Sequence, residues 1–558
     1  MKGLEAMKRN KRLIALVCSI AAAATLSACG NDAHESSEES ETNLMQSEST
    51  AESEISPPES KPAAIDTILG EERTEYNDAL DLSDYPLTKS DVPEDFSLIV
   101  EAESGTLIGS AAVKELSEAS GGKFVNGVNV EGDELKLSIT LEYNGFYDLN
   151  LKTKSSNYKV NSLAVDGMNV GDITTYPTET FADTVVGSIY LEAGTHEISV
   201  TPIWGYIDID QLIVSAAANS ITDDVYKVTA PLVNPNADEN TRRLYKFLCD
   251  IYGKYSLSGQ YADNGRYSNE HLRIKEHTGK SFAVLGMDMG NYSLGSVSHG
   301  TKSMTLEYAY DWYNNSGGIV QLCWHWTSPD GYAIEEGDQH WWRSFYKEAS
   351  LLDLDKIMNG EDEKGYQLLM DDIDNMSAQL ARLRDAGVPV LWRPLHEASG
   401  GWFWWGNCKP ESYKKLWNVM FDKMTNEHNL TNLIWVWNGQ DPEWYPGDET
   451  VDINGWDIYA GKHVDTSQSG RFANMTKNYG EKTKLIALTE NGCVMGPDKV
   501  MRDNARWLFW GIWGGEFTVS NGALNDEYTS FELLTKVYNH ERVLTLDELP
   551  DLKNYTLQ

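Results

Sequence analysis

Cysteine is scarce in this chain, with six residues among 558. Two lie near the N-terminus and four are widely scattered; they are Cys18, Cys29, Cys249, Cys323, Cys408 and Cys493. There is no C-x-x-C pair and no cluster of cysteine with histidine, so the sequence predicts no zinc site. Cys323 lies within an apolar run, which favours a buried thiol. Spacing alone does not assign disulfides among the last four.

Basic residues are also few in comparison with acidic residues. Lys and Arg number 46 against 85 Asp and Glu, which gives a net charge of -39 at pH 7. Nucleic-acid phosphates would be repelled, so a nucleic-acid partner is excluded. Aromatic residues are abundant instead, with 18 Trp and 28 Tyr. They suit contact with carbohydrate better than binding of phosphate.

The N-terminus carries the pattern of a targeting segment. An apolar run from Leu13 to Leu26, short for a membrane span, follows four basic residues. Small residues then lead to Cys29 in L-S-A-C, which predicts a leader over residues 1–28 that is cleaved on export. The pattern resembles a bacterial lipobox. That resemblance implies lipidation of Cys29 and a lipid anchor on the extracellular face of a bacterial membrane. The alternative is an ordinary secretory signal and a secreted protein.

Large apolar residues are nearly absent from residue 30 to about residue 61, where Ser and Glu dominate. Such a segment cannot bury enough surface to fold, and its like charges extend it. We therefore expect a tether over residues 29–94, in which residues 62–94 are transitional to the folded part. The length of the chain predicts two folded units beyond it.

Residues 95–217 predict an all-β domain. Alternating stretches such as L-K-L-S-I-T-L and S-I-Y-L-E-A-G-T-H-E-I-S-V recur between turn residues, without helical periodicity. This spacing is typical of a β-sandwich.

Three blocks of the same domain, E-A-E, S-G-G-K-F-V-N and W-G-Y-I-D-I-D, resemble carbohydrate-binding module family 35. The resemblance implies a jelly-roll binding module with a structural calcium held by Glu101, Glu103 and Asp210. Oxygen ligands of this kind suit a hard cation; solvated strand acids are the alternative. Trp204 is a candidate sugar-stacking residue, although a buried tryptophan of the sandwich fits the same position.

Residues 224–558 alternate strand-like and helix-like segments, which indicates βα units. Eight nearly continuous apolar strands, from K-Y-S-L-S-G-Q to W-L-F-W-G-I-W-G, favour a TIM (β/α)8 barrel. Active sites of such barrels form at the C-terminal strand ends. Most of the predicted strands finish there in a polar residue: Gln260, Asp288, His325, Glu397, Asn438, Asp457 and Glu490.

The stretch H-E-A-S-G-G-W-F-W-W-G, residues 396–406, combines a carboxyl with three tryptophans. Tryptophan stacks on pyranose rings, and a carboxyl beside it can do acid–base work. Glu490, at the end of strand seven, would supply the second carboxyl that retaining glycosidases need. No basic residue neighbours Glu490, so we expect no ion pair there, and we expect His396 to hold Glu397 protonated or to orient sugar hydroxyls. The alternative is that the tryptophans fill a core and Glu397 caps a helix.

W-R-P-L-H-E-A-S-G-G-W-F-W-W-G, G-G-I-V-Q-L-C-W-H-W and A-L-T-E-N-G resemble glycoside hydrolase family 26 over about residues 240–545. The resemblance implies a retaining enzyme without a catalytic metal or cofactor, with Glu397 as acid/base and Glu490 as nucleophile. It implies endo-β-1,4-mannanase as the main activity of the family. The sugar contacts that it implies are His396 and Trp402 at subsite −1, His325 on strand three, Tyr459 on the nucleophile, and Trp341 and Trp342 in a loop.

We therefore expect a monomeric retaining mannanase acting on mannan, glucomannan or galactomannan. One alternative is another β-glycanase of the same family, such as a mixed-linkage glucanase or a β-1,3-xylanase. A less favoured alternative is a surface lipoprotein that binds polysaccharide without cleaving it.

Overall fold

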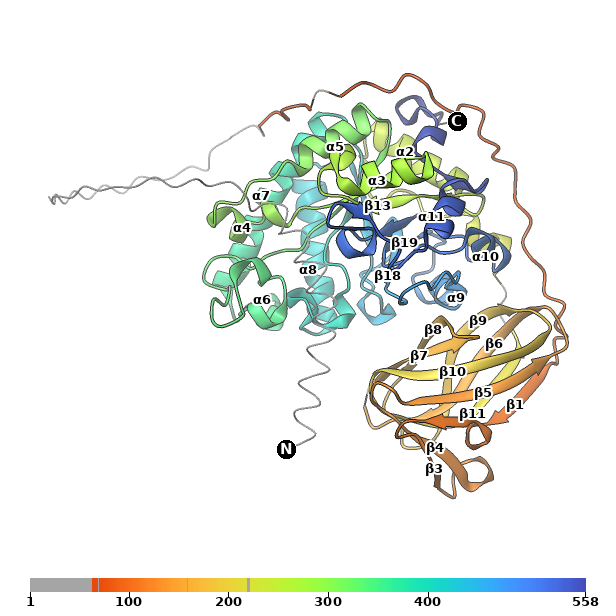
Figure 1. Cartoon of the computed structure of the whole chain (residues 1–558). Helices are drawn as coiled ribbons and strands as arrows, with labels where there is room; N and C mark the ends of the chain where they lie inside the picture. The colour runs from red at the N-terminus through yellow and green to blue at the C-terminus, as the bar shows by residue number, and fades with distance from the viewer. Residues whose placement is uncertain (1–62, 69, 158, 218–220, 558) are drawn as a thin grey trace.

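The computed structural model describes residues 63–68, 70–157, 159–217 and 221–557. The predicted leader, Cys29 and most of the predicted tether lie outside these residues. The described chain forms a β-sandwich module, which lies beside a larger α/β barrel (Figure 1). Within the described residues, no helix combines the length and the apolar character needed to cross a bilayer.

The module consists of two antiparallel sheets packed face to face. The first sheet has the order β3 (Ala112–Glu115), β4 (Lys123–Val128), β11 (Ile207–Ala216), β6 (Gly145–Lys154), β9 (Ala182–Leu191), with β1 (Ser97–Glu101) paired to β11. The second has the order β2 (Thr106–Ile108), β5 (Glu134–Leu141), β10 (Gly194–Trp204), β7 (Lys159–Val165), β8 (Met168–Thr175). Alternate residues of β5, from Leu135 to Leu141, are buried in the core between the sheets. The predicted sandwich is confirmed.

The second body is a closed barrel of eight parallel strands. They are β13 (Gly259–Tyr261), β14 (Val284–Asp288), β15 (Ile319–Cys323), β16 (Val390–Arg393), β17 (Leu433–Trp437), β18 (Ile453–Ile458), β19 (Leu485–Asn491) and β20 (Trp510–Ile512). Each overlaps a predicted strand, so the TIM barrel is confirmed. The strands are almost wholly buried, because side chains fill the interior and helices cover the outside.

Helices surround the barrel. The longer ones are α2 (Glu239–Ile251), α3 (Asn269–Thr278), α5 (Thr305–Asn314), α7 (Glu363–Asp385), α8 (Pro410–Asp422), α9 (Ser469–Asn478) and α11 (Phe531–Tyr538). In α7 the predicted face is buried, with Ile373, Met376 and Leu380 fully covered. The chain leaves α7 through Gly387, whose φ of +71° is the left-handed conformation that glycine adopts without strain.

Residues 63–94, expected to be transitional, lie as a strap along the barrel (Figure 1). Arg73 donates from Nη2 to the carbonyls of Asp547 at 3.0 Å and Leu549 at 2.9 Å. Further along, Arg506 Nη1 donates to the carbonyl of Tyr85 at 2.8 Å. Arg506 precedes β20, so this part of the strap crosses the N-terminal side of the barrel, opposite the strand ends that carry the predicted site.

Candidate active site

The C-terminal end of β16 places Glu397 at the mouth of the barrel. Between the strand and Glu397 the backbone turns sharply, with Leu395 at φ +51° and Glu397 at φ +54°. Such left-handed residues cost about 1 kcal/mol or more each, and they occur where a side chain must be aimed. The amide of Glu397 donates to the carbonyl of Asn438 at 2.9 Å, which fixes the turn. The Glu397 side chain makes no capping hydrogen bond to the short helix that follows, so the capping alternative is wrong.

Glu490 lies in β19, where its backbone is in register with Asp457 of β18. One carboxylate oxygen from each of Glu397, Asp457 and Glu490 lies within 4.8 Å of the others. Retaining glycosidases hold their two catalytic carboxyls about 5–5.5 Å apart, whereas inverting enzymes leave room for a water between them. The structure therefore brings the two predicted glutamates together at a separation that suits direct nucleophilic attack.

Glu490 has two strong donors. Arg393, the last residue of β16, donates from Nη2 to Glu490 Oε2 at 2.5 Å, and Tyr459 OH donates to Oε1. The prediction that Glu490 takes part in no ion pair is therefore wrong. Its basic partner lies 97 positions away in the sequence and reaches it only because the barrel closes. The placement of Tyr459 agrees with the role that the family resemblance implies for it.

The two glutamates differ in protonation. Burial raises the pKa of Glu397 well above its usual value, and the negative charges of Asp457 and Glu490 raise it further; the hydrogen bond from Trp402 Nε1 to Oε2, at 2.9 Å, opposes this weakly. Burial and Asp457 also raise the pKa of Glu490, but Arg393 and Tyr459 counteract them. The proton therefore resides on Glu397 and the negative charge on Glu490.

His396 and His325 form a pair beside the carboxyls. The two Nε2 atoms are 3.2 Å apart, and His325 Nδ1 lies 2.8 Å from Asp288 Oδ2. Burial, together with Arg393 and His325, lowers the pKa of His396 well below its usual value, so its imidazole is neutral. His396 thus bonds to His325 rather than to Glu397, and the expectation that it holds the acid protonated is wrong. Orientation of sugar hydroxyls stays a prediction.

The three tryptophans of the 396–406 stretch have different surroundings. Trp404 and Trp405 are fully buried, and their indole N–H groups donate to the carbonyls of Trp326 at 2.7 Å and His396 at 2.8 Å. Only Trp402 is partly exposed and bonded to a catalytic carboxyl. The core-filling alternative therefore applies to two of the three, because a loop that folds over a barrel mouth has an interior of its own.

Trp341 and Trp342 lie in a 3-10 turn, Trp341–Arg343, of the long loop after β15. Each is partly exposed and stacks on a histidine: Trp341 on His299, with ring centroids 4.5 Å apart, and Trp342 on His340 at 4.1 Å. Each indole thus has one face covered. Their contact with sugar stays a prediction.

The sequence interpretation passed over Arg393 and Trp513. Trp513 follows β20 and packs 4.7 Å from the Tyr261 ring and 5.7 Å from His325, measured between centroids. Arg393 could have been found from its position, because it is a charged residue in the apolar strand V-L-W-R and a buried charge needs a partner. Trp513 lies in a tryptophan-rich strand, and its sequence does not separate it from core residues.

In the module, hydrogen bonds satisfy the predicted calcium ligands only in part. Glu101 Oε1 accepts from Ser120 Oγ at 2.8 Å, and Asp210 Oδ1 accepts from the amide of Ser120 at 2.9 Å. The Oε2 atoms of Glu101 and Glu103 are buried without a hydrogen-bond partner. Burial and the two glutamates raise the pKa of Asp210. The orphaned oxygens of Glu101 and Glu103, beside Asp210, fit a hard cation. Trp204 is the last residue of β10, and its side chain lies outside the described part.

Both bodies of the fold match known families. The model of glycosyl hydrolase family 26 matches residues 233–548. The chain belongs to this family. The model of carbohydrate-binding module family 35 matches residues 98–217, which is the β-sandwich.

Individual relatives resemble the family 26 chain over both domains. A mannan endo-1,4-beta-mannosidase of Thermothelomyces thermophilus is 35% identical over 82% of this chain and 91% of its own. Mannan endo-1,4-beta-mannosidase B of Piromyces sp is 34% identical over 81% of this chain and 77% of its own. The crystal structure of the Podospora anserina GH26-CBM35 β-(1,4)-mannanase is 32% identical, with a TM-score of 0.55, and covers 83% of this chain and 100% of its own.

Proposed function

We propose that this family 26 protein is a retaining endo-β-1,4-mannanase that cleaves mannan, glucomannan and galactomannan. The observation that carries the proposal is a pair of buried carboxyls, Glu397 and Glu490, whose oxygens lie within 4.8 Å of each other. Arg393 and Tyr459 bind Glu490, whereas burial and the neighbouring acids raise the pKa of Glu397 well above its usual value. The relatives named as mannan endo-1,4-beta-mannosidases support mannan as the polymer.

The geometry supports a double displacement. Glu397 donates its proton to the glycosidic oxygen, while Glu490 attacks the anomeric carbon and the leaving chain departs with that proton. Arg393 and Tyr459 hold Glu490 charged and oriented for the attack. Water then cleaves the glycosyl-enzyme with Glu397, now ionised, as its base.

A product profile on mannan, galactomannan, lichenan and β-1,3-xylan tests the proposal. We expect short manno-oligosaccharides from the mannans and no products from the other two. Glu397→Gln and Glu490→Gln should each lower kcat by about a hundredfold or more while polymer still binds. Glu363→Gln, on the exposed start of α7, is the matched control and should leave kcat unchanged.

Two alternatives have distinct outcomes in the same assay. Products from lichenan or β-1,3-xylan with none from mannan would identify a different β-glycanase of the family. Binding of polymer without any hydrolysis would identify a non-catalytic protein. The contrasted environments of Glu397 and Glu490 argue against the second outcome, because a binding protein has no need for two carboxyls with different protonation.

We propose further that Glu101, Glu103 and Asp210 hold a structural calcium, and that the module binds the same polymer through Trp204. The orphaned Oε2 atoms of the two glutamates support the first part. Isothermal titration with Ca²⁺ tests the first part, and titration with mannan tests the second. We expect Trp204→Ala to weaken the binding of mannan and to leave the binding of Ca²⁺ unchanged.

We also propose that the protein is exported and anchored as a monomer through a lipid on Cys29. The L-S-A-C pattern supports this placement. Cys29→Ser should move mannanase activity from the envelope fraction to the medium. An ordinary secretory signal would instead place both forms in the medium.

A further inference from the structure

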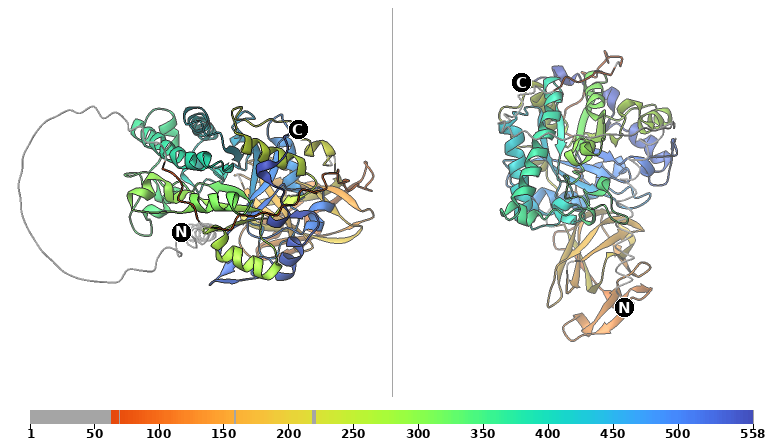
Figure 2. Two further views of the ribbon diagram at one scale, coloured as in Figure 1. Left: turned by 90° about the horizontal axis from the view of Figure 1, so that it is seen from above. Right: turned by 90° about the vertical axis from the view of Figure 1, so that its left-hand side faces the viewer.

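The module is docked on the barrel through a built interface rather than by a linker alone. The module lies against one end of the barrel (Figure 2), where its strands β8 and β9 contact α9 (Figure 1). Thr466 Oγ1 donates to the carbonyl of Asn169 at 2.7 Å, Ser469 Oγ donates to that of Ser188 at 3.1 Å, and Arg471 pairs with Asp172. These contacts hold one orientation of the module.

The two backbones also approach closely. A Cβ on Gly187 would lie 2.6 Å from the Cα of Gly470, so a side chain would force the surfaces apart. Ser188, Ser469 and Gly470 are buried in the described structure. The interface is therefore a packed contact between two glycines, framed by hydrogen bonds and an ion pair.

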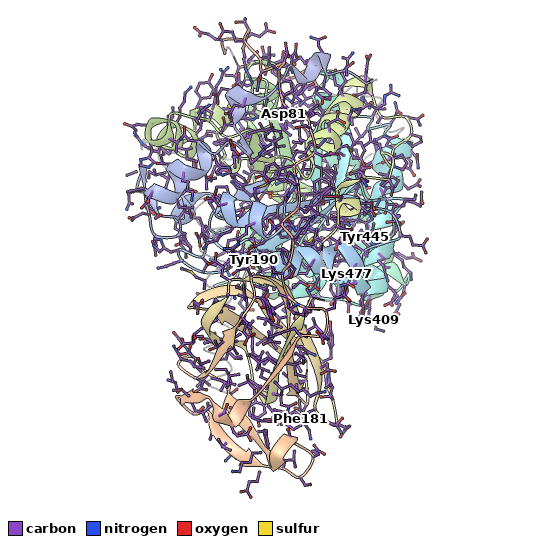
Figure 3. All side chains as sticks on the ribbon, turned by 90° about the vertical axis from the view of Figure 1, so that its right-hand side faces the viewer. Asp81, Phe181, Tyr190, Lys409, Tyr445 and Lys477 are labelled. Atoms are coloured by element: carbon purple, nitrogen blue, oxygen red, sulfur yellow. The ribbon has the colours of Figure 1, made fainter. Side chains whose placement is uncertain are left out.

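The docking carries the end of β8 to the rim of the barrel. Tyr176 follows β8 directly, and its OH lies 3.4 Å from Oδ2 of Asp441 in the loop after β17. Figure 3 shows Tyr445 of the same loop and Lys477 of α9 on the barrel, directly above the module. The side chain of Tyr176 is 56% exposed.

The loop that Tyr176 meets is part of the catalytic mouth. Asn438, three residues before Asp441, accepts the hydrogen bond from the amide of Glu397. Gln440, which directly precedes Asp441, donates from Nε2 to the carbonyl of Asp457 at 3.2 Å. Tyr176 thus lies on the side of the mouth that carries the proton donor.

The opposite side of the mouth has a different character. A cavity of about 580 Å³ opens between the ends of β13 and β20, lined by residues that include Asp288, Trp513 and Glu270. In the closed order of the barrel, β17 lies opposite β13, and β16, which leads to Glu397, lies opposite β20. A polymer chain that runs from this cavity across the catalytic pair would reach the loop after β17, which Tyr176 contacts through Asp441.

We propose that Tyr176, a residue of the binding module, forms an outlying subsite of the catalytic cleft and stacks on a mannose ring of the leaving-group chain. This rests on the proposed mannanase function. A tyrosine face offers the apolar surface that packs against the C–H face of a sugar. The contact with Asp441 places the ring beside the loop after β17, so the module would lengthen the substrate-binding cleft.

Kinetics on substrates of two lengths test the proposal in the full-length protein. Mannohexaose and mannan place several sugar rings on the leaving-group side of the cleaved bond. An aryl β-mannobioside places only its aryl group there. Tyr176→Ala should lower kcat/KM on the long substrates by roughly 3- to 10-fold and leave the aryl substrate within about twofold. Tyr176→Phe keeps the ring and should retain most of the activity. Tyr366→Ala, at an exposed tyrosine on α7, is the matched control and should change neither substrate.

A second variant tests the role of docking. Asp172→Lys replaces the partner of Arg471 by a like charge, so the module should detach from α9 and the long-substrate advantage should fall as it does in Tyr176→Ala. Unchanged kcat/KM on mannohexaose in both variants would overturn the proposal, and so would an equal loss on the aryl substrate. A wild-type protein that releases nothing from mannan would overturn the proposed function instead.

Discussion

Arg393 and Glu490 form a fully buried ion pair, with Nη2 of Arg393 2.5 Å from Oε2 of Glu490. The same guanidinium binds Asp457 through Nη1 at 2.6 Å. One positive charge is therefore shared by two carboxylates, and an excess of negative charge is left beside Glu397. This excess adds to burial in keeping Glu397 protonated. The arginine thus acts on both catalytic groups, by direct contact with one and through the balance of charge on the other.

Replacement of Arg393 by methionine should leave Asp457 and Glu490 buried without a cation. Breaking such a pair on one side typically costs about 3–5 kcal/mol in the free energy of unfolding, which urea denaturation measures. Arg393 lowers the pKa of Glu490, so its removal should move the acidic limb of kcat/KM to higher pH. Arg384→Met, at a partly exposed pair with Asp385, should change stability by less than about 1 kcal/mol.

Replacement of Trp402 by phenylalanine should move the alkaline limb of the pH profile of kcat/KM. The acid form of Glu397 is the active one, so activity is lost as pH rises through its pKa. The indole N–H stabilises the carboxylate and lowers that pKa, and its loss should raise the pKa and shift the alkaline limb of kcat/KM upward. A pH profile on an aryl mannobioside gives the limb independently of the drop in rate. A downward shift would contradict the assignment.

Replacement of Trp404 by alanine should mainly lower stability, whereas the same replacement of Trp402 should mainly lower activity. Trp404 is fully buried, so Trp404→Ala should cost about 3–5 kcal/mol in the free energy of unfolding through the cavity that it leaves. Trp402→Ala should cost less than about 2 kcal/mol but lower kcat/KM strongly. Thermal denaturation and initial rates on the two purified variants check both. Equal melting temperatures would show that Trp404 is not a core residue.

The proposed calcium site predicts that removal of calcium affects the module and spares the barrel. With free Ca²⁺ at about a hundred times its Kd, binding adds about 2.7 kcal/mol to the stability of the folded module. A chelator should therefore lower the melting temperature of the module. The rate of hydrolysis of a short aryl substrate, which depends on the barrel, should not change. Asp210→Asn should remove the response to chelator, whereas Glu115→Gln, at an exposed position of β3, should keep it.

Local patterns accounted for the architecture. Period-two alternation predicted the sandwich strands, and apolar runs that end in polar residues predicted the barrel strands, because burial on one or both faces of a strand is written into consecutive residues. Glu397 and Glu490 were predicted for the same reason: each stands at the end of its own strand. The distance between them came from the structure.

Contacts between distant segments were not predictable in this way. The partner of Glu490 is 97 positions away, and neither the pairing of His396 with His325 nor the burial of Trp404 and Trp405 has a local signal. The same holds for the meeting of Tyr176 with Asp441, which are 265 positions apart. The order of residues was enough to state the chemistry and the two folds, since these follow from short-range periodicity and motif. The protonation of the catalytic pair, the division of the tryptophans between core and cleft, and the place of the module at the rim depend on packing across the closed barrel, where charge, burial and contact are set by residues that the chain brings together only on folding.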